Sequence, residues 1–299
     1  MTPQIITSSS SDSALKIKEA LSLLGRGNKS VREMRAMIMG LEEVMKSMPE
    51  YVPGEDFETT HHFEPGIYMR ECLIPKGFIV TGKIHKTGHL NILSKGKITV
   101  WTEDGMKTLE APAVINSKPG IKRVGLAHED TIWMTVHSNP TDERDIKSVE
   151  ARLFADSFDE AYLSSPRTFE DSLHFLGFST EEVVSLSQNT HDMTQFPYPV
   201  GVEVLDSPIH GKGLFVSLGS RGFSAGDTVA PGRTGGKRTP AGRYCNHSGD
   251  PNVFPVMRDN GDVDLVASRN ILAGEEIFND YYLTYTKTRF SGGSDKCLL

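Results

Sequence analysis

The sequence predicts a mainly β chain with α-helical segments. Short apolar runs separated by Gly, Pro and Asp turn signals recur over residues 59–137 and again over 200–290. Stretches with three- and four-residue apolar spacing precede and separate these two regions. We therefore divide the chain into an N-terminal helical segment (1–55), a β-barrel (56–141), a helical connector (142–199), a small Gly-rich β domain (200–290) and a mobile tail (291–299).

Composition bounds the class of protein. The chain has 299 residues, of which 37% are apolar and 24% charged, enough for a buried core and for two domains. The net charge of −7 carries no strong nucleic-acid signal, because phosphate binding needs a basic face. There is no membrane-length apolar run and no secretory signal, and three cysteines are too few for a disulfide framework. We expect a soluble cytoplasmic protein.

The N-terminal segment contains an amphipathic helix from Ser30 to Met48. Its apolar residues recur every three or four positions and form one Met-rich stripe, which is typical of a packing face. The stripe could cover the rest of the chain or a second subunit, so the sequence allows a homo-oligomer through this helix or through the barrel. The stripe consists of Val31, Met34, Met37, Ile38, Leu41, Val44 and Met45.

The barrel region carries a string from Gly82 to Gly96 that reads GKIHKTGHLNILSKG, followed by Lys118-Pro119-Gly120 and His128. These strings resemble the motifs of the cupin barrel, although Lys83 and His89 stand where that family has a histidine and a glutamate. His85 and His89 lie four residues apart, so on a strand they share one face.

His128 could join this pair, and three imidazoles suit a divalent metal such as zinc, iron or nickel. The alternative is that the three histidines are hydrogen-bonded polar groups inside the barrel or at its mouth.

The C-terminal region contains three separated strings, which read IHGKGLF at 209–215, RYCNHSGDPN at 243–252 and ASRNILAGEEIFNDY at 267–281. In this order they resemble the SET domain of protein lysine methyltransferases over residues 200–290. The resemblance implies that the three strings fold around one site that transfers a methyl group from S-adenosylmethionine to a lysine of a protein substrate. It assigns the catalytic phenol to Tyr281. The cofactor pocket would be lined by Lys212, Gly213, Arg243, Tyr244, Asn246, His247 and Tyr285, the last of these covering the adenine.

Three departures from the family pattern affect this interpretation. Asn279 replaces the aromatic residue that usually stands two positions before the catalytic tyrosine, and Gly249 replaces a cysteine, so the zinc site of many members is missing. Only 29 residues, Leu214 to Gly242, lie between the Gly-Lys-Gly turn of the first string and the start of the second string, too few for one wall of the usual peptide groove. We expect Gly232 to Gly242 to form a flexible basic loop.

Three functions remain open. The first is a protein-lysine N-methyltransferase whose barrel recognises the substrate or mediates oligomerisation. The second is a non-catalytic structural or regulatory binding protein, because the combination of folds resembles proteins encoded in tailed bacteriophage or prophage genomes and expressed in the cytoplasm of a bacterial host. The third is a metal-dependent cupin enzyme that acts on a small molecule.

Overall fold

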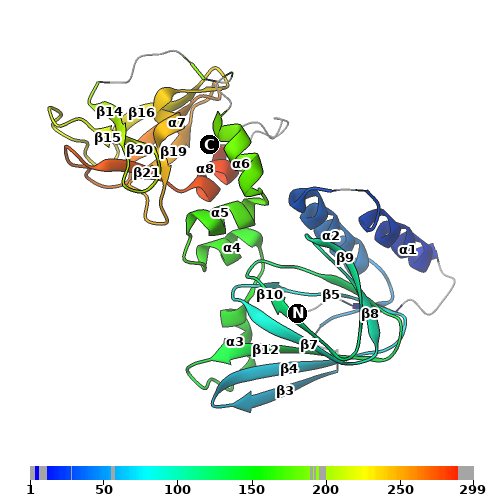
Figure 1. Ribbon diagram of the computed structural model, residues 1–299. Coiled ribbons are helices and arrows are strands. Elements are labelled where there is room, and N and C mark those ends of the chain that lie inside the picture. Colours follow the sequence, from blue (N-terminus) through cyan, green and yellow to red (C-terminus); the bar gives the residue numbers. More distant parts are fainter. Residues whose placement is uncertain are drawn as a thin grey trace. The chain divides into compact units, whose positions relative to one another are not determined.

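The computed structural model describes residues 4–6, 12–27, 29–54, 58–188, 191, 193–194 and 200–288. It confirms a mainly β chain with helical segments (Figure 1). The described chain divides into two compact units, Met1–Ser165 and Pro166–Leu299. The predicted mobile tail, 291–299, lies outside the described residues.

Two helices and a strand pair precede the barrel. Strand β1 (Gln4–Ile6) pairs with β2 (Tyr51–Val52), and the helices α1 (Asp12–Leu24) and α2 (Val31–Lys46) lie between them in the sequence. Helix α2 begins with a capping box, in which Ser30 and Glu33 each bond the other's backbone amide.

Most of the Met-rich stripe of α2 is buried within this chain, although Val44 is exposed. Met34, Ile38, Leu41 and Met45 pack with Ile79 and other residues of the neighbouring sheet in one apolar cluster. Figure 1 shows α1 and α2 beside the strands of the first unit. The predicted packing face therefore covers the protein's own sheet.

Eight strands of the first unit form a double-sheet jelly roll. Their antiparallel pairs are nested, with β8–β9 innermost, followed by β7–β10, β5–β11 and β4–β12. One sheet has the order β10-β7-β12-β4-β3, and the other has the order β2-β1-β5-β11-β8-β9. This two-sheet architecture is the one that cupins adopt, so the predicted cupin-like barrel is confirmed as a fold. The strands are β3 (Thr59–Glu64), β4 (Gly66–Ile74), β5 (Phe78–Thr81), β6 (Ile84–His85), β7 (His89–Lys95), β8 (Lys97–Thr102), β9 (Gly105–Glu110), β10 (Ala113–Ser117), β11 (Val124–Ala127) and β12 (Thr131–Asn139).

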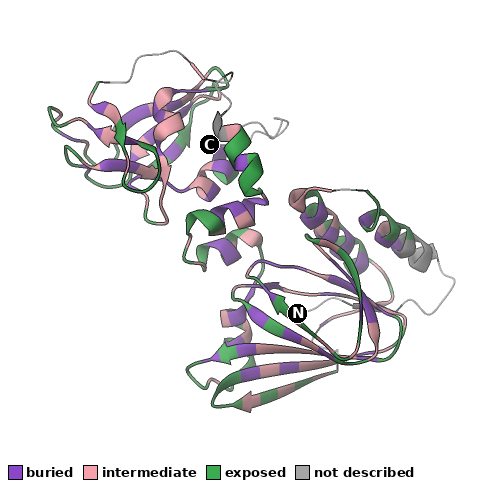
Figure 2. Cartoon of the chain, viewed as in Figure 1, coloured by how far each residue is buried: buried purple, intermediate pink, exposed green. Residues whose placement is uncertain are grey.

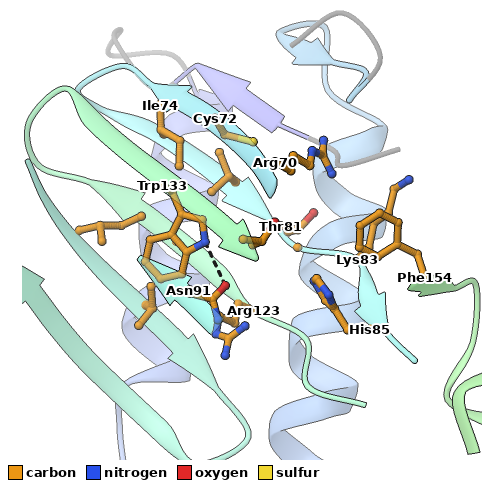
Figure 3. A pocket seen from close by; sticks show the side chains of 16 residues that line it. Arg70, Cys72, Ile74, Thr81, Lys83, His85, Asn91, Arg123, Trp133 and Phe154 are labelled. Carbon is orange, nitrogen blue, oxygen red and sulfur yellow. Dashed lines mark hydrogen bonds between the residues drawn. The ribbon is translucent and has the colours of Figure 1, made fainter. Parts of the chain in front are cut away.

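The strands alternate between the interior and solvent, as two-residue periodicity requires. Along β7, the residues His89, Asn91 and Leu93 are buried while Leu90 is exposed. Figure 2 shows the same alternation of colours along β4 and β7. The interior of the jelly roll therefore receives both polar and apolar side chains, as Figure 3 shows for Asn91 and Ile74.

The predicted connector is shared between the two units. Helix α3 (Ile146–Leu153), strand β13 (Phe154–Ala155) and helix α4 (Phe158–Leu163) belong to the first unit, where β13 pairs with β6. Helices α5 (Phe169–Leu176) and α6 (Thr180–Gln188) belong to the second. The five-part division drawn from the sequence remains a prediction.

The second unit has two four-stranded sheets. One has the order β14-β15-β21-β18 and the other β17-β16-β20-β19. Their core is built from apolar residues such as Leu214, Val229, Leu265 and Ile277. The elements are β14 (Val202–Asp206), β15 (Lys212–Val216), β16 (Thr228–Thr234), β17 (Lys237–Arg238), α7 (Pro240–Tyr244), β18 (Asn246–His247), β19 (Val253–Met257), β20 (Val263–Ala267), β21 (Glu276–Asn279) and α8 (Tyr281–Thr288).

The segment from Gly232 to Gly242 is not the flexible loop that the sequence predicted. Strand β17 pairs with β16, and Thr239 caps α7 by accepting a hydrogen bond from the amide of Gly242. Arg238 is buried and donates a hydrogen bond to the carbonyl of Leu186. The glycines allow this compact arrangement, because a Cβ at Gly242 would lie 2.0 Å from the carbonyl oxygen of Gly232.

In the part of the chain that the structure describes, none of the helices combines the length and the apolarity needed to cross a bilayer.

A buried ion pair joins α2 to the jelly roll and generates the first prediction. The Lys122 ammonium lies 2.9 Å from the Glu42 carboxylate, which also accepts a hydrogen bond from Thr81, and both charged side chains are only 6% exposed. Glu42→Gln leaves the lysine charge buried without a counter-ion, so we expect a loss of about 3–5 kcal/mol in the free energy of unfolding. Urea titration measures this loss.

The neighbouring Glu43 is the control, because its side chain is 66% exposed and pairs with Lys46 on the surface. Glu43→Gln should cost less than about 1 kcal/mol. Equal losses in the two variants would show that the buried pair has no special role in stability.

Candidate functional site

The three C-terminal strings meet in one sheet. The first string forms β15, the second forms β18, and the third forms β21, which lies between them. Strand β21 pairs antiparallel with β15 and parallel with β18, with Asn246 opposite Phe278 and His247 opposite Asn279. Segments more than 30 residues apart therefore contribute adjacent side chains.

The carboxylate of Glu276 connects all three strings. Its Oε1 atom accepts a hydrogen bond from the Asn246 amide at 2.8 Å, and its Oε2 atom accepts one from Ser207 at 3.0 Å. The Glu276 carboxylate occupies the space where Gly213 lacks a side chain, because a Cβ there would lie 2.1 Å from Oε1. The same Asn246 amide also donates to the Lys212 carbonyl at 3.2 Å. Glycine at 213 is therefore a packing requirement of the site.

Asn252, from the Pro-Asn end of the second string, bonds to the backbone of β21. Its amide donates to the Glu276 carbonyl and its side-chain oxygen accepts from the Phe278 amide, both at 2.8 Å. The side chain is almost fully buried. Asn252 thus ties the loop after His247 to the strand that leads into Tyr281.

His247 and Tyr281 lie against each other. Their ring centroids are 5.1 Å apart, and the Tyr281 backbone amide donates to His247 Nδ1 at 3.1 Å. Because Nδ1 accepts, the ring proton is on Nε2, which donates to the Arg167 carbonyl at 2.9 Å. The imidazole is therefore neutral in this arrangement and bridges two distant parts of the second unit.

The Tyr281 hydroxyl points inward. It donates to the carbonyl of Cys245 at 3.3 Å, and burial raises the pKa of the phenol well above its ordinary value. The group is therefore a neutral phenol at physiological pH. It can position a ligand by hydrogen bonding, but it is a poor general base.

A segment upstream of the three strings covers this pair. The Phe169 ring lies 6.2 Å from the His247 ring and 6.0 Å from the Tyr281 ring, which it meets edge-on. The carbonyl of Arg167 lies 2.8 Å from where a Cβ of Gly249 would be, so the cysteine that the family usually carries there would collide with it. The sequence gives no sign that this segment belongs to the site, because its helical pattern indicates a connector.

A cavity of about 60 Å³ opens beside Tyr281. Asn279, Thr284 and Tyr285 line it together with Tyr281, and residues of β16, β17, α7, α8 and β20, which include Arg233 and Arg238, complete the wall. The buried Asn279 Oδ1 and Thr284 Oγ1 atoms have no hydrogen-bond partner among the described residues. Such atoms are costly to bury unless a ligand or water bonds them.

The predicted site residues do not all converge. Gly213, Asn246 and His247 come together with Tyr281, and Tyr285 lies across the cavity from β16 with its ring edge against Phe178. The remaining three predicted residues, Lys212, Arg243 and Tyr244, do not place their side chains with this group. The Lys212 ammonium is half exposed and pairs with Asp206, so only its carbonyl reaches the site, while Arg243 stacks over Tyr244 on α7.

The jelly roll holds a second cluster, formed by His85, His89 and His137. One ring nitrogen from each lies within 4.8 Å of the others, and all three residues are buried. The rings of His85 and His89 stack at 3.8 Å. The third member is His137 and not the predicted His128, whose Nε2 bonds the Thr99 hydroxyl at 2.7 Å. The pairing of β12 with β7 is what identifies His137, because the register Val136–Leu90 continues to His137 beside His89.

The ring nitrogens of this cluster are mostly unsatisfied. His85 Nδ1, His89 Nε2 and both ring nitrogens of His137 have no hydrogen-bond partner among the described residues. The expectation that His85, His89 and His128 are hydrogen-bonded polar groups therefore holds for His128, which bonds Thr99, and for His89 Nδ1, which lies 3.2 Å from the Thr87 carbonyl. Neutral imidazoles with free nitrogens are suitable metal ligands, so the donor set fits a divalent ion.

Comparison with known families supports the interpretation of the second unit. The family model described as "SET domain" matches residues 136–282. The chain carries a SET domain. SET domains are usually protein lysine methyltransferases, so the match indicates a methyltransferase-type function with S-adenosylmethionine and a protein substrate in general. The match begins upstream of residue 200 and includes the segment around Phe169 that covers the site. No curated protein matches the chain.

Several solved structures that are similar to part of the chain are described as cupins or cupin-like proteins. An RmlC-like cupin from Shewanella frigidimarina is 15% identical over 31% of this chain and 91% of its own, with a TM-score of 0.25. A cupin-2 domain protein from the same organism is 16% identical over 27% of this chain and 80% of its own, with a TM-score of 0.23. A cupin-like protein from Thermotoga maritima is 12% identical over 28% of this chain and 68% of its own, with a TM-score of 0.25.

The buried histidines make the stability of the metal-free protein sensitive to acid. Burial lowers the pKa of His89 to about 4 and that of His137 to about 3, and holds that of His85 well below its ordinary value. In the unfolded chain each histidine binds a proton near pH 6.5, so the folded state binds fewer protons below that pH. Stability is full above pH 6.5 and falls as the pH drops towards 4.

For His89 alone the expected loss is on the order of 3 kcal/mol. Urea unfolding of the chelator-treated protein between pH 7 and pH 4 measures it, and His89→Gln should flatten the dependence. If the free energy of unfolding did not change between pH 7 and pH 4, the burial of these three histidines would be contradicted.

Proposed function

We propose that the SET domain transfers a methyl group from S-adenosylmethionine to the side chain of a lysine in a protein. The observation that carries the proposal is the convergence of Asn246, His247 and Tyr281 beside a cavity that contains unsatisfied polar atoms. Three strings that are weak signals separately lie in one sheet around this point.

The residues present fit the cofactor. Asn246 uses its amide hydrogens on Lys212 and Glu276, and its Oδ1 atom has no partner among the described residues. This oxygen is an acceptor suited to the cofactor's ammonium group. We assign Gly213, the Lys212 backbone, Arg243, Tyr244 and His247 to the same pocket. Bound there, S-adenosylmethionine would supply an electrophilic methyl group.

The cavity beside Tyr281 is suited to the lysine. Its volume of about 60 Å³ admits a narrow chain, and Asn279 Oδ1 is an acceptor for an N–H of the amine. Desolvation lowers the pKa of a buried amine, which favours the neutral form needed for attack. The Tyr281 hydroxyl then holds the amine in line with the methyl group. Such positioning lowers the activation free energy by roughly 7–11 kcal/mol. We assign Tyr285, which the sequence placed over the adenine, to this lysine cavity.

The upstream segment compensates for the short stretch before the second string. Phe169 supplies an aromatic wall against His247 and Tyr281 from outside the three strings. The stretch from Leu214 to Gly242 is too short to build one wall of the usual peptide groove. We propose that α5, which begins with Phe169, forms part of that wall.

Tyr281→Phe tests the catalytic assignment. We expect methyl transfer to fall by about 100-fold or more, because the positioning hydroxyl is lost while the ring packing stays. Transfer of a radiolabelled methyl group to proteins of a bacterial lysate is the measurement, and it also reveals the substrate. S-adenosylmethionine should still raise the melting temperature of the variant.

Tyr282→Phe is the matched control, because this neighbouring tyrosine lies outside the cavity lining and should leave transfer unchanged. Equal activity in wild type and Tyr281→Phe would overturn the assignment. Neither transfer nor a thermal shift in the wild type would favour the non-catalytic binding protein.

We also propose a divalent metal held by His85, His89 and His137, because their free ring nitrogens lie close together. The jelly roll would then contribute a metal-dependent role in substrate recognition, self-association or small-molecule chemistry. The phage or prophage origin and the cytoplasmic location remain predictions from the sequence.

Metal analysis of the purified protein tests this site. His89→Ala should lower the bound metal from about one equivalent to near zero, because two imidazoles bind much more weakly than three. His128→Ala is the control and should retain the metal, since His128 bonds Thr99 and lies outside the cluster. Equal loss in the two variants, or no metal in the wild type after incubation with zinc and dialysis, would rule the site out.

A further inference from the structure

Arg167 precedes the helix that covers the SET domain site, and its backbone lies in the left-handed region, with a φ of 55°. Among the residues that the structure describes, Asp142 is the only other non-glycine residue with a positive φ. Glycine adopts this conformation freely, whereas residues with a side chain rarely do. Strained residues of this kind concentrate at functional sites, so the contacts of this arginine bear on the site.

The left-handed turn presents the Arg167 carbonyl to the site while the chain enters α5. The carbonyl accepts a hydrogen bond from His247 Nε2 at 2.9 Å. The next residue, Thr168, already caps the helix, because its hydroxyl accepts from the Asp171 amide and its amide donates to the Asp171 carboxylate. Gly249 leaves room for this approach, since a Cβ there would lie 2.8 Å from the same carbonyl oxygen. The backbone of Arg167 is therefore held between the helix cap and the site.

The side chain of Arg167 reaches a second group of the site. Its guanidinium lies 3.8 Å from the Asp280 carboxylate, which is only 1% exposed. Asp280 caps α8, because its Oδ1 atom accepts from the Leu283 amide at 3.1 Å and its carbonyl accepts from the Thr284 amide at 2.8 Å. A nearby cation stabilises a buried carboxylate. The arginine therefore stabilises the residue from which α8 begins.

Both contacts of Arg167 converge on Tyr281. This tyrosine is the first residue of α8 and follows Asp280 directly, and its amide donates to Nδ1 of the His247 ring at 3.1 Å. Helices α5 and α8 also lie side by side (Figure 1). The arginine thus holds the residue before the tyrosine with its side chain, and the ring on the tyrosine amide with its backbone. A displacement of about 1 Å in a positioned group can lower a reaction rate about 100-fold, so contacts of this kind affect the rate.

We propose that Arg167 is a positioning residue for methyl transfer. Its carbonyl fixes His247, its guanidinium fixes Asp280, and the two contacts hold the Tyr281 hydroxyl where it meets the lysine amine. The inference rests on the proposed function and adds to it a residue from outside the three motif strings. It also explains why the left-handed position carries an arginine. Glycine would relieve the backbone and keep the carbonyl, but it would lose the contact with Asp280.

Arg167→Gly separates the two contacts, because it keeps the left-handed backbone and removes only the guanidinium. Initial rates of radiolabelled methyl transfer by the full-length protein, at a fixed amount of bacterial lysate and varied S-adenosylmethionine, give an apparent kcat and KM. We expect kcat to fall about 10-fold while KM stays within about two-fold, because Tyr281 shifts and the cofactor pocket does not. Arg167→Lys retains a cation near Asp280, so its kcat should lie between those of Arg167→Gly and the wild type.

Arg167→Val tests the carbonyl contact. A β-branched residue does not readily adopt the left-handed region, so the carbonyl should move away from His247. We expect kcat to fall about 100-fold and KM for S-adenosylmethionine to rise, because His247 belongs to the proposed cofactor pocket. The proton on His247 Nε2 gives a readout that needs no activity. Bonded to the carbonyl, it exchanges slowly with water and gives an NMR resonance, which Arg167→Gly should keep and Arg167→Val should lose.

Arg269→Gly is the matched control, because Arg269 is an exposed arginine of the same unit that pairs with Glu275 on the surface, and it should leave kcat and KM unchanged. Transfer by Arg167→Gly at the wild-type kcat would overturn the inference alone, even if the melting temperature fell, since a merely structural role lowers stability and not the rate. No transfer by the wild type would overturn the proposed function and the inference with it. If Arg167→Val failed to fold, Arg167→Gly and Arg167→Lys would still decide.

Discussion

The SET domain site depends on one close approach, the Glu276 carboxylate packed into the space that Gly213 leaves open. From there the carboxylate bonds Asn246 and Ser207, and so joins three segments that are distant in the sequence. A methyl group at position 213 would push the carboxylate out of this space and release both partners. Because β21 begins at Glu276 and ends at Asn279, two residues before Tyr281, the same contact also positions the strand that leads to the phenol.

Both units keep buried polar atoms without a hydrogen-bond partner among the described residues. In the SET domain, Asn252 and His247 are hydrogen-bonded to backbone, whereas Asn279 Oδ1 and Thr284 Oγ1 beside Tyr281 have no such partner. In the jelly roll, imidazole nitrogens and the Thr135 hydroxyl have none either. Unpaired buried groups lower stability, and a bound ligand, metal or water in either unit would offset that cost.

Periodicity predicted most of the fold, because the signals were local. The spacing of Met34, Ile38 and Leu41 identified the buried face of α2, and the turn residues separated the barrel strands. The residues that sequence reasoning missed depend on non-local register. His137 lies beside His89 only because β12 pairs with β7. The place of His128 after Pro119-Gly120 makes it a candidate ligand, but its ring bonds Thr99 of β8 and stays outside the cluster. Phe169 likewise belongs to the site only through the folding of the chain around β18.

The bridge through His247 bears on where the SET domain begins. Its ring bonds the Arg167 carbonyl on one side and the Tyr281 amide on the other, and Gly249 lies against the same carbonyl. A fragment cut at the first recognisable motif, near residue 200, would therefore leave the histidine with an unused proton and expose the aromatic face next to the tyrosine. The compact unit that contains the site is therefore longer than its three motif strings, and a truncation that keeps the site should be made before Pro166.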